Sequence, residues 1–149
     1  MLRSAVLVIA LGYQLWPVLA MAQQTLSDSP RYIADIELET SSELVDLLQR
    51  ANQLLVDGVA AQDGSASVTF VLHGPVIKDL LRQNYAANRQ LVDLAASLSA
   101  LRVVKIEVCR TWMGVNDVSE TDLQPFVEPV DLASSEVRRL RERQNYLDF

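Results

Sequence analysis

Soft ligands and nucleophiles are scarce in this sequence of 149 residues, which holds one cysteine, Cys109, and one histidine, His73. A single cysteine excludes an internal disulfide framework, and one cysteine with one histidine is too few ligands for a cysteine-rich zinc site. The chain also lacks glycine-rich phosphate-binding motifs, a GxSxG motif and an HExxH motif. It therefore carries no signature of a nucleotide-binding protein, a serine hydrolase or a zinc peptidase, and we predict neither a cofactor nor a metal ion.

Positive charge is scarce as well. The chain has 13 Lys and Arg against 19 Asp and Glu, a formal net charge of −6. An acidic protein of this size presents no basic surface for a phosphate backbone or for anionic lipid, so we predict no nucleic-acid partner. Half of the residues are hydrophobic and no segment is of low complexity. This composition predicts a compact globule with an apolar core.

Long apolar runs are confined to the first 22 residues, which have the organisation of a signal peptide. Arg3 supplies the basic start, Ala5–Leu11 is an apolar run, and Ala20 and Ala22 are small residues two positions apart. A glycine, a glutamine and a proline interrupt the apolar stretch, which argues against the alternative of an uncleaved membrane anchor. We predict cleavage after Ala22, a periplasmic or secreted location, and no stable membrane insertion of the remaining chain.

Removal of residues 1–22 from the chain of 149 leaves 127 residues, a length that suits one domain. Residues 23–31 are polar and contain a proline, so they are predicted to form a flexible lead-in. The remainder, residues 32–149, is predicted to be a single α/β domain.

Strand and helix patterns alternate along this domain. Strand patterns occupy residues 34–38, 68–72, 103–108 and 126–130. Helical patterns occupy residues 40–58, a segment after Pro75, residues 91–101, one turn at 119–123, and a final helix over about 135–144. The alternation predicts a three-layer α/β fold with a mainly parallel sheet flanked by helices. In such a fold the functional crevice lies beyond the carboxyl ends of the strands, where both His73 and Cys109 are expected.

Cys109 is the strongest candidate for a reactive residue, because a thiolate is a strong nucleophile. Positive charge on Arg110 and amides of a following helix are expected to lower its pKa. The alternative is a buried cysteine that serves as a small apolar core residue. His73 is predicted either to act on the thiolate as a hydrogen-bond or proton donor, or to hold the turn at Gly74. Trp112 and the methionine after it are predicted to wall a pocket beside the thiol or to form a subunit contact.

Several short motifs, in their order and spacing, resemble the DsrE/DsrF-like family of sulfur-handling proteins. They are His73 to Pro75 after one strand, Val108 to Thr111 after the next, and Asp122 to Pro125 before a final helix ending near Tyr146. The resemblance covers residues 32–149. It implies a small α/β fold that assembles into trimers or hexamers, and a cysteine that carries sulfur as a persulfide, a role that falls on Cys109.

The sequence thus predicts an exported DsrE-like protein that binds or relays sulfur through Cys109, with His73 and Arg110 as further site residues. An active protein would be a sulfurtransferase-like carrier whose partners are thiol or sulfane-sulfur proteins. Two alternatives stay open. One is a non-catalytic oligomeric binding module with a structural cysteine, and the other is a redox-sensing thiol that forms an intersubunit disulfide.

Overall fold

The fold is built on one parallel sheet. The computed structural model describes residues 30–61, 63–144 and 146–149, so the predicted signal peptide and residues 23–29 lie outside the described residues. Within the described ranges, five parallel strands pair in the order β4-β3-β2-β1-β5. Their bounds are β1 Tyr32–Glu37, β2 Val68–His73, β3 Val104–Cys109, β4 Val127–Val130 and β5 Leu147–Asp148.

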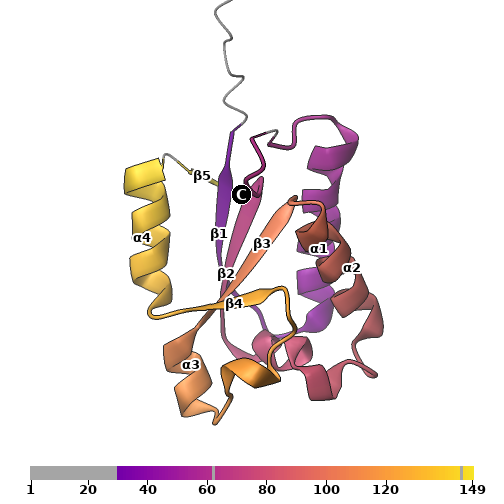
Figure 1. Cartoon of the computed structure of the whole chain (residues 1–149), viewed down its shortest axis with the longest axis vertical. Coiled ribbons are helices and arrows are strands. Elements are labelled where there is room, and N and C mark those ends of the chain that lie inside the picture. The colour runs from indigo at the N-terminus through magenta and orange to yellow at the C-terminus, as the bar shows by residue number, and fades with distance from the viewer. Residues whose placement is uncertain (1–29, 62, 145) are drawn as a thin grey trace, which may run out of the picture.

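Helices cover both faces of the sheet. One face carries α1 and α2, the opposite face carries α4, and α3 follows β3 at the carboxyl end of the sheet (Figure 1). Their bounds are α1 Ser41–Val56, α2 Arg89–Ala100, α3 Arg110–Val115 and α4 Ala133–Gln144. Three short 3-10 helices, η1 to η3, span Pro75–Leu80, Arg82–Asn84 and Glu120–Asp122. The predicted α/β fold with helices on both sides of a parallel sheet is confirmed.

Helix α1 begins where the sequence predicts it. The backbone N–H of Glu43 donates to Thr40 Oγ1 at 3.4 Å, and the backbone N–H of Thr40 donates to Glu43 Oε2 at 3.0 Å. This capping box satisfies donors that the first helical turn leaves without partners. The helix ends at Val56, and Gly58 then adopts a φ of +70°, a conformation that favours glycine.

Both faces of the sheet are buried, as is typical of parallel strands between helical layers. The cluster beneath α1 and α2 includes Leu44, Leu48, Phe70, Leu72 and Ile106. The cluster beneath α4 consists of Ile33, Val71, Cys109, Ala133, Val137 and Leu140. Side chains alternate between the faces along each strand, so Val71 and Cys109 lie on the α4 side while their sequence neighbours lie on the other.

Two segments differ from the expectation or extend it. The segment after Pro75 forms the 3-10 helix η1 rather than an α-helix, although its apolar residues are buried as predicted. Strand β5 has no counterpart in the sequence prediction, because two residues are too few to show a period. It pairs with β1, and the ring of Phe149 beyond it lies 5.9 Å from the ring of Tyr32 and 5.8 Å from that of Phe70.

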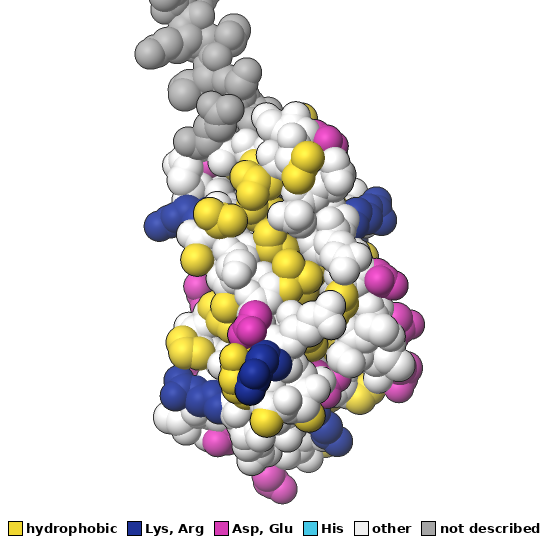
Figure 2. Space-filling model, turned by 90° about the vertical axis from the view of Figure 1, so that its right-hand side faces the viewer, with side chains coloured by type: hydrophobic (Ala, Val, Ile, Leu, Met, Phe, Trp, Pro, Cys, Tyr) yellow, Lys and Arg dark blue, Asp and Glu magenta, His cyan; other side chains and the backbone are white. Residues whose placement is uncertain are grey.

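The outer face of the α1 and α2 layer carries a band of apolar side chains (Figure 2). At the carboxyl ends of these helices, Leu55, Val56 and Leu101 are exposed by 40%, 69% and 60%. Among the described residues, no helix has the length and apolar character needed to cross a membrane.

Candidate functional site

His73 and Cys109 end two neighbouring strands. The register pairs Leu72 with Val108, so the next residue of each strand follows side by side at the carboxyl edge of the sheet. Both lie on the face that α4 covers, since side chains alternate along a strand. The structure thus brings the one imidazole and the one thiol of the chain to the same edge, which is the edge that the parallel fold favours for function.

A pocket of about 490 Å³ lies at this edge, where α3 begins beside the start of α4 (Figure 1). Its walls include the side chains of Asp35, His73, Cys109, Trp112, Val115 and Leu132. The volume is that of a site for a small molecule. Most of the wall is apolar, and its few polar side chains come from β1, β2 and β3 and from the first turns of α3 and α4.

Cys109 is 6% exposed, and backbone amides and one hydroxyl act on its thiol. Burial raises the pKa of Cys109, but the backbone N–H groups of Ala133, Trp112 and Thr111 and the hydroxyl of Thr111 lower it, and the net pKa lies below its ordinary value. Cys109 directly precedes α3, and Ala133 is the first residue of α4, so the amides come from the starts of two helices. These donors favour the thiolate in an otherwise apolar setting.

Arg110 does not supply the charge that the sequence predicted for this thiolate. Its guanidinium forms ion pairs with Glu120 at 2.7 Å and with Asp131 at 2.6 Å, and it is absent from the pocket wall. It is the first residue of α3 and follows Cys109 directly, but its side chain lines a different pocket. The expected electrostatic role of Arg110 is therefore corrected, because backbone amides and a hydroxyl are the groups that lower the pKa of Cys109.

The imidazole of His73 interacts with carboxylates of β1 rather than with the backbone of the turn. Nε2 lies 3.0 Å from Asp35 Oδ1, and Nδ1 lies 4.0 Å from Glu37 Oε2. Asp35 is a wall residue that the sequence analysis missed. Its position on the polar side of a period-two strand was visible in the sequence, but its proximity to His73 depends on the pairing of β1 with β2.

Trp112 and Met113 were predicted to share a role beside the thiol, but they lie in different places. Trp112 lines the pocket, whereas Met113 is 3% exposed and packs into the core beneath α1 and α2.

In the part of the chain that the structure describes, no group of three or more His, Cys, Asp or Glu side chains is placed to hold a metal ion.

Comparison with known proteins supports the fold. No family model matches the chain, and no curated protein matches it. The chain is similar to the solved structure of MTH1491, a protein of unknown function from Methanobacterium thermoautotrophicum, with a TM-score of 0.61 and 16% sequence identity over 80% of this chain and 97% of that one. At that identity the likeness shows the fold alone.

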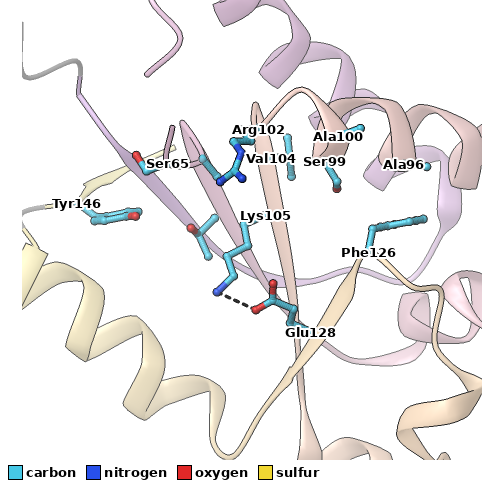
Figure 3. Close-up of a pocket in the computed structure, with 12 residues that line it drawn as sticks. Ser65, Ala96, Ser99, Ala100, Arg102, Val104, Lys105, Phe126, Glu128 and Tyr146 are labelled. Atoms are coloured by element: carbon cyan, nitrogen blue, oxygen red, sulfur yellow. Dashed lines mark ion pairs between the residues drawn. The ribbon is translucent and has the colours of Figure 1, made fainter. Parts of the chain in front are cut away.

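A larger cavity of about 630 Å³ lies at the opposite end of the sheet, where β3 extends beyond the start of β4 (Figure 3). Phe126 and Tyr146 lie on opposite sides of it. Lys105 Nζ lies 3.0 Å from Glu128 Oε2 and 2.6 Å from Glu107 Oε1, so its charge is compensated. No cysteine or histidine is among its wall residues, so the Cys109 pocket is the candidate site.

Proposed function

We propose that the protein binds and relays sulfane sulfur through a persulfide on Cys109. The observation that carries the proposal is a thiol with a lowered pKa in the wall of a small, mainly apolar pocket. The family resemblance of the motifs around His73 and Cys109 supports the same chemistry. A thiolate attacks sulfur better than a thiol does, and an apolar wall keeps water away from a reactive persulfide.

The relay consists of two transfers without net oxidation. The Cys109 thiolate attacks the terminal sulfur of a donor persulfide, an S–S bond forms on Cys109, the S–S bond of the donor breaks, and the donor leaves as a thiolate. The thiolate of an acceptor then attacks the outer sulfur on Cys109, which regenerates the Cys109 thiolate. One cysteine suffices for this cycle, whereas a dithiol cycle would need a second.

Mass spectrometry of the intact protein after incubation with an organic persulfide or with polysulfide tests the first transfer. We expect one added sulfur atom per chain on Cys109, none on Cys109→Ser, and slower addition to the protein unfolded in urea. Absence of the adduct, or equal rates for folded and unfolded protein, would rule out a site-directed transfer.

The second candidate is a binding module in which Cys109 is structural. The observation that favours it is the 6% exposure of Cys109 and its packing against Ile33 and Val71. Alkylation of the native protein separates the two functions. A thiol that reacts with iodoacetamide near neutral pH supports sulfur chemistry, while one that reacts only after unfolding supports the structural role.

Export, membership of the DsrE/DsrF-like family and self-association are parts of the same proposal. Self-association is supported by Val56 and Leu101, apolar side chains exposed by 69% and 60%. Exposed apolar surface of this kind marks protein contacts. Light scattering on the eluting protein should give a mass above that of one chain, and Val56→Glu should lower that mass; a monomeric wild type would contradict self-association.

A further inference from the structure

The Cys109 pocket has an acidic side. Asp35 lines it, and His73, also in the wall, stands between Asp35 at 3.0 Å and Glu37 at 4.0 Å. The cluster of two carboxylates and one imidazole is negative whether the imidazole is neutral or protonated. A Cys109 thiolate adds a further negative charge on the neighbouring strand.

The wall of the Cys109 pocket contains no permanent cation, since its residues, all within the described part of the chain, include neither lysine nor arginine. Arg110 is adjacent in sequence, but Glu120 and Asp131 hold its guanidinium at 2.7 and 2.6 Å outside the pocket. Arg141 lines the neighbouring pocket together with Asp35 and Glu37, but its guanidinium pairs with Asp148 at 2.6 Å. The chain as a whole carries a net charge of −6, so its long-range field also repels anions.

The rest of the wall is suited to an organic group. Trp112, Val115 and Leu132 contribute apolar surface, and Val115 and Leu132 are exposed by 79% and 48% at the mouth. A bound alkyl group would cover these side chains and gain from their removal from water. An inorganic sulfur anion would gain nothing from them and would lose hydration beside the carboxylates.

We propose that Asp35 and Glu37 make the pocket selective for low-molecular-weight organic persulfides with an uncharged or cationic carrier, against inorganic sulfur anions and carboxylate-bearing persulfides. This selectivity rests on the proposed sulfur relay. In the selected reaction the terminal sulfur of the persulfide bonds to Cys109, its bond to the carrier sulfur breaks, and the carrier leaves as a thiolate that takes a proton from water. No oxidant or reductant is consumed.

Charge-selective alkylation tests the acidic side without depending on sulfur transfer. The rate at which neutral iodoacetamide alkylates Cys109 is divided by the rate at which anionic iodoacetate alkylates it. This ratio is then divided by the same ratio for the protein unfolded in urea. The side chains of Asp35 and Glu37 are exposed by 41% and 68% and act through water, so each predicts a preference of about threefold for the neutral reagent and both together about tenfold. Asp35→Asn should reduce it to about threefold, because one of the two charges is removed.

The matched control is Asp46→Asn, which removes the same charge from the exposed surface of α1, away from the pocket. It should leave the preference unchanged, and circular dichroism should show all variants folded. A folded wild type without a preference, or equal effects of the Asp35 and Asp46 variants, would overturn the selectivity.

Persulfides of N-acetylcysteamine, cysteamine and mercaptopropionic acid then provide donors of similar size with neutral, cationic and anionic carriers, and thiosulfate is the inorganic anion. With each rate divided by that of the protein unfolded in urea, we expect sulfur to add to Cys109 about tenfold faster from the first two donors than from the others. Equal addition from all donors overturns the selectivity and leaves the relay standing. If no donor adds sulfur to Cys109 although alkylation still prefers the neutral reagent, the sulfur relay is overturned, and with it the selectivity for organic persulfides.

Discussion

Thr111→Val removes the hydroxyl of Thr111 beside the Cys109 thiol, and we expect a measurable change in the reactivity of that thiol. Threonine and valine have similar shapes, so the substitution removes a hydroxyl and little else. That hydroxyl is one of the donors that lower the pKa of Cys109. We therefore expect the variant to have a higher pKa at Cys109 and a smaller thiolate fraction at neutral pH.

The size of the effect follows from the place of the hydroxyl among the donors. Of the groups that lower the pKa of Cys109 the Thr111 hydroxyl contributes least, and Thr111 is exposed. An exposed hydrogen bond contributes about 0.5–1 kcal/mol, and the loss of thiolate is partly offset because a more basic thiolate is a better nucleophile. The net rate near neutral pH should fall about twofold, while at alkaline pH the variant should react up to about twofold faster.

The assay is the reaction of the native protein with dipyridyl disulfide across a pH series, followed by the absorbance of the released thione. Thr111→Ser keeps the hydroxyl and should behave like the wild type. Curves for the valine variant and the wild type that coincide, or a valine variant that reacts faster at neutral pH, would refute the assignment of Thr111 as a donor to the thiolate.

Three further predictions concern stability. Burial raises the pKa of Glu107 more than the ion pair with Lys105 lowers it. Ionisation of the Glu107 carboxyl therefore destabilises the fold as pH rises from about 4 toward neutrality. Glu107→Gln should gain stability relative to wild type over that range in urea titrations, and a constant difference would contradict this. Thr40→Ala removes the capping box of α1 and should lower the free energy of unfolding by about 1 kcal/mol, whereas Thr40→Ser should not. Leu48→Ala, at a site with 0% exposure, should lower it by about 2–5 kcal/mol, and a smaller loss in chemical denaturation would place Leu48 outside the core.

Much of the fold could be predicted because its signals are local. The capping box at Thr40 and the leucine spacing after it define α1, and runs rich in β-branched residues define β2 and β3. Parallel strands then place their ends at one edge, which is why His73 and Cys109 could be expected together. The 3-10 type of the helix after Pro75 could not be predicted, because a pattern over six residues does not distinguish the two helix types.

The site could be predicted only in part, because its chemistry depends on strand order and on side-chain direction. Asp35 meets His73 only because β1 pairs with β2, a contact across 38 positions of sequence that no local pattern records. Arg110 follows Cys109 in sequence, yet the start of α3 turns it toward Glu120. The donors that lower the pKa of Cys109 include the backbone of Ala133, which has no side-chain signature.

A sulfur relay requires that Cys109 pass its sulfur on to an acceptor. The most direct measurement loads the folded protein with radiolabelled sulfur from an organic persulfide, removes the donor, adds a small acceptor thiol, and follows the label. The relay predicts that label leaves the native protein for the acceptor at a rate proportional to acceptor concentration, and that Cys109→Ser carries no label to transfer. Label that stays on the protein, or that Cys109→Ser acquires and passes on equally, would contradict it.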